Sequence, residues 1–202
     1  MVFFKMNQKF KKFKFLLPIV VIIVIVTTGY MVIYAHNPFV EIASVINTLL
    51  VGSMSHKTAP EIIGIDKWLN ADDASKLKIN DLRGSVVLID FWTYACINCQ
   101  RSLPYVVDWD KKYRDKGLVV IGVHTPEFRF EQNVDNVLSA VKEYGIEYPV
   151  AIDNNYKTWR AYRNHYWPAK YLIDKSGNIA YMRFGEGGYD ITEAKIQELL
   201  AE

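Results

Sequence analysis

Residues 88–99 read Leu88-Ile-Asp-Phe-Trp-Thr-Tyr-Ala-Cys96-Ile-Asn-Cys99 and contain both cysteines of the chain. The run Val86–Trp92 is rich in β-branched and aromatic residues, which is typical of a buried strand. A helix is expected to follow from about Ile97 to Lys116, so Cys96 lies where that helix begins. Unpaired backbone N–H groups and the positive end of the helix dipole favour a thiolate there. Cys96 is therefore predicted to be an exposed nucleophile. Cys99, one turn further along, is predicted to attack the mixed disulfide that Cys96 forms.

Asp90 interrupts this apolar strand six positions before Cys96. Burying a carboxylate is costly, so its presence there calls for a reason. Burial should raise the pKa of Asp90 and make it a candidate proton acceptor for Cys99. Alternatively, its carboxylate simply accepts hydrogen bonds from backbone groups at the strand end. The spacing alone leaves both interpretations open.

The two cysteines form one Cys-x-x-Cys motif. A secreted protein stabilised by disulfides usually spreads more of them along its chain, so the spacing favours a reactive pair. Structural zinc needs about four ligands, and the histidines are scattered. Covalent haem attachment is excluded because Gln100, not histidine, follows Cys99. An inert local disulfide stays open as an alternative. The histidines are His36, His56, His124 and His165.

The N-terminal region has the composition of a membrane anchor. Leu16–Ala35 is an uncharged run dominated by Ile, Val and Leu, and as a helix it would span about 30 Å, the thickness of the hydrocarbon core. The lysines before it predict a cytoplasmic N-terminus, with everything after Ala35 on the far side. A cleaved signal peptide is the alternative, but its apolar region is usually shorter, and Ile33 stands where a small residue is preferred. No cysteine lies directly after the run, so a lipid-modified N-terminal cysteine is excluded.

The expected organisation has four parts. Residues 1–15 form a basic cytoplasmic segment, 16–35 a transmembrane anchor, 36–60 a tether and 61–202 a globular domain. Five lysines lie in the first fifteen residues; without them the 24 basic residues of the chain fall to 19, against 22 acidic ones. The remainder is therefore slightly negative and has no bulk charge that would attract nucleic acid, so that class of partner is set aside.

Strands and helices are expected to alternate beyond the tether. A leading hairpin is expected from Trp68-Leu69 and Lys76–Ile79, around the turn-prone residues 70–75. Further strands are expected at Val86–Trp92, Leu118–Val123, Val150–Ile152, Ala169–Ile173 and Ile179–Phe184. Helices are expected at Ile97–Lys116, Asn133–Tyr144, Asn155–Tyr162 and Ile191–Leu200. This order indicates an α/β sandwich with a mixed sheet.

Four stretches carry a resemblance to a known family. They are Leu82-Arg-Gly-Ser-Val-Val-Leu-Ile-Asp-Phe-Trp-Thr-Tyr-Ala-Cys-Ile-Asn-Cys-Gln-Arg-Ser-Leu-Pro-Tyr105, Gly122-Val-His-Thr-Pro-Glu-Phe128, Tyr166-Trp-Pro-Ala-Lys-Tyr-Leu-Ile-Asp174 and Phe184-Gly-Glu-Gly-Gly-Tyr189. From about Ala59 to its C-terminus, the chain resembles the TlpA-like branch of the thioredoxin superfamily, and within it the redox domain of DipZ-type proteins. The resemblance implies a thioredoxin-like three-layer sandwich with a central mixed β-sheet, here preceded by one N-terminal transmembrane helix.

The resemblance also implies roles for individual residues. Asp90 matches the buried acid that thioredoxins carry on the strand before the dithiol, which favours the proton-acceptor role. Pro104 matches the proline of the active-site helix. Pro168 matches the proline that faces the dithiol after a cis peptide bond, so the backbone of Trp167 would pair with an incoming extended polypeptide. An ordinary trans proline that opens a strand is the alternative for Pro168.

The chain also departs from its relatives. Ser102 stands where relatives that reduce haem-attachment cysteines often carry an acid. DipZ-type proteins are commonly fused to a multispanning electron-delivery domain, whereas one span is expected here. Electrons would therefore come from a separate membrane protein of CcdA or DsbD type.

Further residues are expected to shape the substrate-binding surface. In this fold the strand ending at Val123 and the loop after Phe184 can approach the dithiol and line a groove. Aromatic side chains beside the dithiol would form an apolar platform for unfolded chains. The predicted set is Trp92, Tyr94, His124, Glu127, Trp167, Pro168 and Glu186. A turn histidine and solvated loop acids are the alternative for His124, Glu127 and Glu186, and Trp109 and Trp159 are expected in the core.

These features predict a membrane-tethered, extracytoplasmic thiol–disulfide oxidoreductase that exchanges disulfides with exported proteins, with reduction as the favoured direction. The expected enzyme is a monomer that uses no cofactor beyond its own Cys96–Cys99 disulfide and binds no metal. Two alternatives stay open: a redoxin-type peroxidase that reduces peroxides with Cys96, and a copper metallochaperone that holds the metal through both thiolates. The Cys-x-x-Cys spacing counts against a peroxidase. No metal-binding histidine is evident beside the motif, which counts against a metallochaperone.

Overall fold

The computed structural model describes residues 57–202. The predicted basic segment, the membrane anchor and most of the tether lie outside these residues, whereas the predicted globular domain lies wholly within them. Within this described part of the chain, no helix is both long and apolar enough to cross a lipid bilayer.

A six-stranded sheet forms the centre of the domain, in the order β1-β4-β3-β2-β5-β6. The strands β2, β3 and β4 are parallel to one another, whereas β1, β5 and β6 pair with their neighbours in antiparallel fashion. The predicted mixed sheet is therefore confirmed. The strands are β1 (Lys67–Leu69), β2 (Val86–Trp92), β3 (Leu118–His124), β4 (Val150–Ile152), β5 (Ala169–Ile173) and β6 (Ile179–Phe184).

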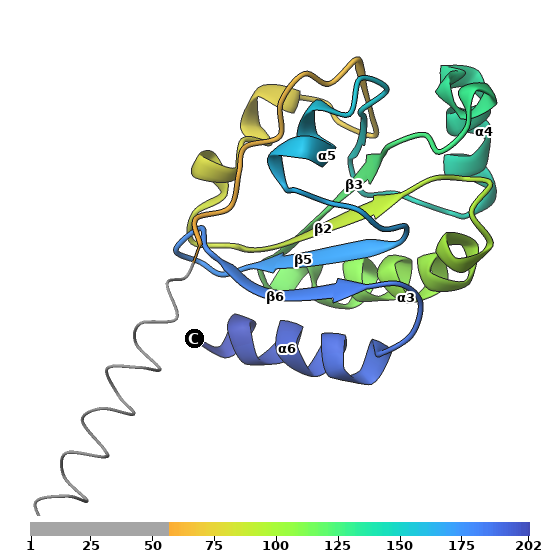
Figure 1. Ribbon diagram of the computed structural model, residues 1–202. Coiled ribbons are helices and arrows are strands. Elements are labelled where there is room, and N and C mark those ends of the chain that lie inside the picture. The colour runs from red at the N-terminus through yellow and green to blue at the C-terminus, as the bar shows by residue number, and fades with distance from the viewer. Residues whose placement is uncertain (1–56) are drawn as a thin grey trace, which may run out of the picture. The chain divides into compact units, whose positions relative to one another are not determined.

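Helices cover both faces of this sheet, which gives the expected three layers. Figure 1 shows α3 and α6 along one face and α5 on the other. Helix α4 belongs to the side of α3 and α6, because its Val137 shares a hydrophobic core with Leu103 of α3 and Ile196 of α6. The α-helices are α3 (Ile97–Tyr113), α4 (Val134–Glu143), α5 (Lys157–Ala161) and α6 (Tyr189–Ala201). Short 3-10 helices are η1 (Ala74–Lys76), η2 (Ile79–Leu82), η3 (Arg114–Lys116) and η4 (Arg129–Gln132).

Strand β2 separates two hydrophobic cores. Successive side chains of a strand point to opposite faces of the sheet. Leu88 and Trp92 accordingly pack with α3 and α6, whereas Ile89 and Phe91 pack in the core on the side of α5. Every residue of β2 is buried. Asp90 alternates with Ile89 and Phe91, so it lies on the α3 side of the sheet.

The predicted leading hairpin is wrong. The strand β1 does not pair with residues 76–79 but joins the edge of the sheet, where Leu69 lies opposite Val150 of β4. The segment expected to return as a strand, Lys76–Ile79, instead joins η1 to η2, with Lys76 ending the first and Ile79 beginning the second. The start of η2 is held by Glu61, whose carboxylate accepts hydrogen bonds from the backbone N–H groups of Ile79 (2.7 Å) and Asn80 (2.9 Å).

The other predicted elements are confirmed, with small differences at their ends. The helix expected at Ile97–Lys116 contains Pro104 as predicted, but its last turn tightens into η3. Asn133 precedes α4 as its N-cap, with a side chain that accepts from two backbone N–H groups. Gly145 follows α4 with a φ of 63°, the left-handed conformation in which many helices end.

Candidate active site

Three chain segments meet along one edge of the sheet, the edge formed by the ends of its strands and not by an outer strand. Strands β2 and β3 are parallel, so both end at this edge, where Trp92 lies opposite His124. Strand β5 runs the other way, so it begins there, with Ala169 opposite Phe91. The topology therefore brings the Cys-x-x-Cys turn after β2, the loop after β3 and the Trp167–Pro168 segment before β5 to the same place.

Cys96 caps the start of α3. Its Sγ accepts a hydrogen bond from the backbone N–H of Cys99 at 3.3 Å, the bond that an N-cap side chain ordinarily makes. The hydrogen bond from the Cys99 thiol, aided by the backbone N–H groups of Cys99 and Asn98, lowers the pKa of Cys96 to about 7, although partial burial and the charge of Glu127 oppose the shift. The side chain is only partly buried. Cys96 thus offers solvent a thiol that ionises near neutral pH.

Cys99 has the opposite properties. Its side chain is completely buried among the residues of the α3-side core. Burial raises its pKa above the ordinary thiol value, and the hydrogen bond to Cys96 and the negative charge on that sulfur raise it further. Both cysteines are free thiols in this structure. The pair therefore divides into an accessible thiolate and an enclosed thiol that keeps its proton.

Asp90 lies beneath the dithiol with 1% of its surface exposed. Its Oδ1 accepts no hydrogen bond from any group in residues 57–202 but lies 3.4 Å from the Nζ of Lys170 on β5. Burial raises the pKa of Asp90, and the Lys170 ammonium opposes that rise. Backbone groups at the strand end, the alternative interpretation, therefore do not bond to this oxygen. Its partner is a buried lysine that the sequence analysis did not single out.

Glu131 is a second buried acid that the sequence analysis missed. It is completely enclosed in η4. One carboxylate oxygen accepts from the backbone N–H of Ala95 at 3.1 Å, and the other accepts from those of Glu127 and Phe128 at 2.7 and 2.8 Å. One side chain therefore joins the turn before Cys96 to the loop after β3. An acid three residues after Phe128, able to reach back to that amide, was the only signal in the sequence.

His124 and Trp92 do not lie where a docked polypeptide could touch them. Both side chains are completely buried, and their rings meet edge to face with centroids 5.2 Å apart. Burial lowers the pKa of His124 to about 4, and its Nε2 lies 3.3 Å from the Oγ1 of Thr93. The prediction that these two side chains line the substrate surface is wrong for this structure. Instead they pack beneath the turn that leads to Cys96.

Tyr94 and Trp167 are placed at the rim of the site, each partly buried. The Tyr94 ring stacks on His124, and its hydroxyl donates to the Phe130 carbonyl at 3.1 Å. The Trp167 indole N–H donates to the Thr125 carbonyl at 2.9 Å. The Trp167–Pro168 peptide bond is cis, as predicted.

The predicted groove acids are exposed. Glu127 lies in the loop after β3, and Glu186 lies after β6, where its carboxylate is 3.4 Å from the guanidinium of Arg101 on α3. Exposed aromatic rings at Phe128 and Phe130 stack 5.6 Å apart in the same loop as Glu127, and the sequence analysis did not single them out. The predicted core positions of Trp109 and Trp159 are confirmed, because both side chains are buried.

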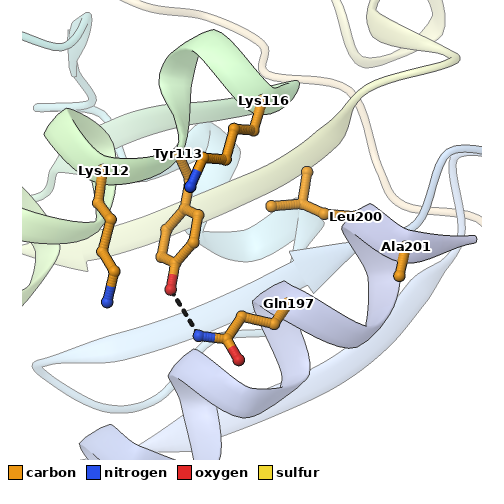
Figure 2. A pocket seen from close by; sticks show the side chains of 6 residues that line it. All are labelled: Lys112, Tyr113, Lys116, Gln197, Leu200 and Ala201. Atoms are coloured by element: carbon orange, nitrogen blue, oxygen red, sulfur yellow. Dashed lines mark hydrogen bonds between the residues drawn. The ribbon is translucent and has the colours of Figure 1, made fainter.

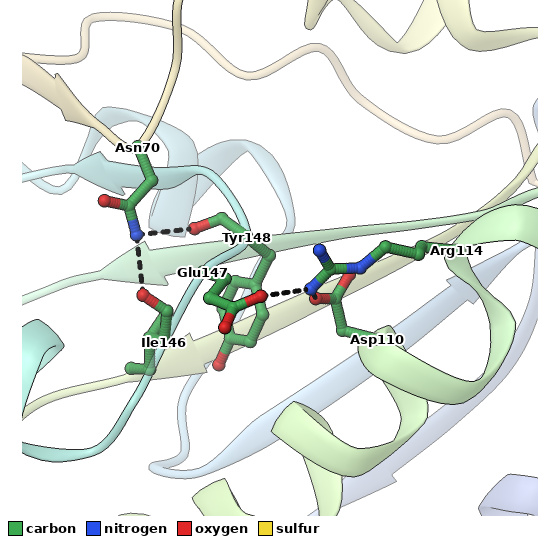
Figure 3. A network of polar contacts seen from close by, with 6 residues as sticks. All are labelled: Asn70, Asp110, Arg114, Ile146, Glu147 and Tyr148. Atoms are coloured by element: carbon green, nitrogen blue, oxygen red, sulfur yellow. Dashed lines mark hydrogen bonds and ion pairs between the residues drawn. The ribbon is translucent and has the colours of Figure 1, made fainter.

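Two open surface pockets lie away from the dithiol. One, of about 440 Å³, lies between the C-terminal ends of α3 and α6 (Figure 2). It is lined by Lys112, Tyr113, Lys116, Gln197, Leu200 and Ala201. The other, of about 320 Å³, borders the polar network in which Arg114 bonds to both Asp110 and Glu147 (Figure 3). Neither pocket is lined by a residue of the predicted site.

Comparisons with known proteins agree with this arrangement. Residues 57–182 match the model of the AhpC/TSA family. The chain is 54% identical over 143 residues to the protein DipZ of Mycobacterium tuberculosis (strain CDC 1551 / Oshkosh), an alignment that covers 71% of this chain and 21% of DipZ. This chain therefore spans only about a fifth of the length of that relative.

Two smaller proteins match over most of their length. Thiol-disulfide oxidoreductase YkuV of Bacillus subtilis (strain 168) is 29% identical over 143 residues, which are 71% of this chain and 94% of YkuV. The solution structure of a thioredoxin-like protein in the oxidized form superposes with a TM-score of 0.65 at 29% identity, and it covers 73% of this chain and 98% of that one. The chain therefore belongs to the AhpC/TSA family, and its described domain has a thioredoxin-like fold.

Proposed function

We propose that this chain is a thiol–disulfide oxidoreductase that reduces disulfides in exported polypeptides on the outer side of a membrane, to which Leu16–Ala35 anchors it. The difference between its two thiols is the observation that carries the proposal. Cys96 is accessible and has a pKa of about 7, whereas Cys99 is enclosed and its pKa is raised. Such a pair suits a reaction in which one sulfur attacks the substrate disulfide and the other resolves the mixed disulfide.

The reaction is a pair of exchanges at sulfur. The Cys96 thiolate attacks one sulfur of the substrate disulfide, so a Cys96–substrate bond forms and the first substrate sulfur leaves as a thiolate. Cys99 then gives its proton to Asp90 and attacks Cys96, which forms the Cys96–Cys99 disulfide and releases the second substrate sulfur. Both leaving thiolates take protons from water. The substrate gains two electrons, and the dithiol loses them.

The surroundings of Cys96 favour an unfolded polypeptide as substrate. Large apolar side chains are exposed on segments that the topology brings to this edge, including the residue directly after Cys96. They are Ile97, Phe128, Phe130, Tyr166 and Phe184, which are 43–57% exposed. Exposed apolar groups gathered at one place mark a surface that binds apolar partners. The Trp167–Pro168 segment borders the same edge, where its backbone would pair with an extended chain.

The pKa of Cys96 favours reduction over oxidation. A value of about 7 is close to that of thioredoxin, whereas the oxidant DsbA has a value of about 3.5. A very low pKa stabilises the reduced dithiol and makes the oxidised form a strong oxidant. A thiolate stabilised less strongly gives up its electrons more readily. A separate membrane protein of CcdA or DsbD type would then return electrons to the Cys96–Cys99 disulfide.

The redox potential tests the direction. The full-length chain is equilibrated with glutathione and dithiothreitol couples, and the fraction of free thiol is measured. A value near −270 mV, that of thioredoxin, is expected for a reductase, whereas one near −120 mV would show an oxidant. Insulin reduction should be lost in Cys96→Ser and should stall at a trapped mixed disulfide in Cys99→Ser. Undiminished turnover of Cys96→Ser would remove the enzymatic proposal.

Thiol labelling in intact cells tests the location. Cys96 should react with a thiol reagent that does not cross membranes, and the protein should sediment with the membrane fraction. Cys96→Ser serves as the matched control, because the enclosed Cys99 should stay unlabelled. Labelling that requires broken cells would place the dithiol on the inner side and contradict this part of the proposal.

A further inference from the structure

One ion pair in the described domain is buried at both ends. Among the ion pairs of residues 57–202, only Lys170–Asp90 has both side chains nearly removed from solvent, with 3% and 1% exposed. The others keep at least one partner a quarter or more exposed. Burying two charges costs several kcal/mol of desolvation for each ion, so such a pair is weak as a device for stability. The position of Lys170 therefore calls for another explanation.

The sheet register places Lys170 directly beside Asp90. The two residues lie opposite each other on the antiparallel strands β5 and β2. Residues opposite each other in a sheet project from the same face. That face carries α3, and Cys99 lies in the core formed there. The lysine thus reaches the carboxylate from the strand beside it, while the enclosed thiol approaches from the helix above.

Arg183 extends this row on the far side of Lys170. It lies opposite Lys170 on β6, and its Nη2 donates to the backbone carbonyl of Glu186 at 3.3 Å. Like charges placed opposite each other repel. Lys170 is therefore the cation that contacts Asp90, while the guanidinium of Arg183 is bound to the loop after β6.

Within residues 57–202, the remaining groups around Asp90 supply no second cation. On β3, Gly122 lies opposite Asp90 without a side chain, and burial lowers the pKa of His124 to about 4, so that it is neutral at pH 7. Tyr148, just before β4, keeps its proton, because burial and the charges of Asp90 and Asp110 raise its pKa. The buried titratable residues of α3 are Cys99, Asp110 and Tyr113, none of which is a cation, and Cys96 directly precedes the helix. The buried residues of α6 are Thr192, Ile196 and Leu199, which carry no charge.

We propose that Lys170 is a positioning residue for the exchange reaction, whose ammonium keeps Asp90 in the carboxylate form that accepts the Cys99 proton. The inference rests on the proposed role of Asp90. Burial alone favours the protonated acid, which is far too weak a base to take that proton from a thiol. A cation 3.4 Å away favours the ionised form. Lys170 thereby sets the pH above which Cys99 can resolve the mixed disulfide.

The step balances within the protein and its substrate. The proton of the Cys99 thiol moves to a carboxylate oxygen of Asp90 as the Cys99–Cys96 bond forms. The bond between Cys96 and the substrate sulfur breaks, and the electron pair leaves with that sulfur. Lys170 neither gains nor loses a proton. The charge of Lys170 acts on the proton transfer, because it determines whether Asp90 is ionised and can accept the proton.

A two-phase reaction of the full-length chain with Ellman's reagent separates the two sulfurs. Cys96 attacks first and releases one nitrothiobenzoate, and Cys99 then displaces the second. Stopped-flow absorbance from pH 5 to 9 gives a rate for each phase. In Lys170→Met the second phase should slow at least about tenfold at pH 7, and its midpoint should rise by at least about one pH unit. The first phase should stay within about twofold of the unsubstituted chain.

Three variants serve as controls. Lys170→Arg retains the charge and should restore most of the second-phase rate. Lys116→Met removes a lysine at the far end of α3 and should leave both phases unchanged. In the double variant Asp90→Asn/Lys170→Met, the second phase should match that of Asp90→Asn alone, because the lysine acts only through the acid.

The outcomes separate this inference from the function it rests on. If Asp90→Asn slows the second phase but Lys170→Met does not shift its midpoint, the role of Lys170 is overturned and that of Asp90 stands. If neither variant affects the second phase, the proton-acceptor role fails as well. If Lys170→Met slows both phases equally, Lys170 is only structural. The same conclusion holds if Lys170→Met unfolds and Lys170→Arg folds but has a second phase slower than that of the unsubstituted chain.

Discussion

The domain encloses two acids near the dithiol, and they are satisfied in opposite ways. Glu131 accepts three backbone hydrogen bonds of 2.7–3.1 Å from two separate segments. Asp90 faces a single ammonium at 3.4 Å, and its Oδ1 has no hydrogen-bond partner among residues 57–202. A carboxylate fixed by backbone donors holds structure in place. One left short of donors can still take a proton, so the same chemical group fastens the loop in one place and, in the proposed mechanism, reacts in the other.

The largest expected effect is on the resolving step of Asp90→Asn. General-base catalysis contributes about 10²- to 10⁴-fold, so release of the second thiol should slow at least about 100-fold at pH 7. The attack by Cys96 should change little, since it needs no proton acceptor once the thiolate has formed. Two-phase kinetics with Ellman's reagent measure both steps. An equal loss in both phases would show that Asp90, like Glu131, serves structure alone.

Replacing Glu131 should chiefly lower stability. Glu131→Ala removes the acceptor of three backbone N–H groups, and the free energy of unfolding should fall by about 3 kcal/mol. For a domain of this size the melting temperature should drop by roughly 6–12 °C. Denaturant titration measures the loss. Glu131→Gln is the matched control, because its amide keeps one accepting oxygen and should lose less. A loss below about 1 kcal/mol in Glu131→Ala would contradict the anchoring role.

Asp90 should also leave a signature in the pH dependence of stability. Its pKa is raised in the folded chain, so the folded state binds that proton more tightly than the unfolded state does. The stability that it contributes is complete below the ordinary carboxyl value of 3.8 and is lost as the pH rises through the raised value. The loss amounts to about 1.4 kcal/mol for every pH unit by which the pKa in the folded chain exceeds that in the unfolded chain.

Urea titrations from pH 3 upward measure this slope. The unsubstituted chain should lose stability relative to Asp90→Asn between about pH 4 and the raised pKa, and the difference should level off above it. Cys96→Ser leaves Asp90 in place, so its stability relative to Asp90→Asn should fall with pH at the same slope. A difference that stays constant with pH would show that burial does not shift the pKa of this acid.

The smallest effect is expected from the exposed acid Glu127. Its charge raises the pKa of Cys96, in opposition to the bonds that lower that pKa to about 7. Glu127→Gln should move the midpoint of Cys96 alkylation down by about 0.3 on the pH scale, and added salt should shrink the difference because exposed charges are screened. Iodoacetamide rates against pH measure it. An upward shift would contradict the assigned sign.

The dithiol end of the fold could be predicted because local patterns determine it. The apolar run of β2, the helix start at Cys96 and the later strands follow from residue type and spacing, and the cis bond before Pro168 followed from the resemblance to relatives. The partners of the buried acids depend on sheet register and loop geometry, which no local pattern gives. Lys170 could have been noticed as a lone charge in the apolar run Ala169–Ile173, yet only the register places it beside Asp90.

The errors have a related origin. The leading hairpin failed because β1 found its partner in β4, some eighty positions away in the chain, rather than in the nearest extended segment. Trp92 was expected at the surface because it directly precedes the reactive turn, and His124 because the strand ending at Val123 can approach the dithiol. The register makes them neighbours at the ends of β2 and β3, where the Tyr94 ring stacks on His124 and the Tyr144 ring meets Trp92 edge to face.

The complete enclosure of β2 has a consequence for timing. A strand covered on both faces and paired along both edges is among the last parts of a domain to open, so its amides should exchange with deuterium only through near-global unfolding. Asp90 therefore lies in a strand of the described domain that opens only rarely. In the proposed mechanism Asp90 must therefore take up and release its proton at the rate of the chemistry at the two sulfurs, without any local opening of the strand that carries it.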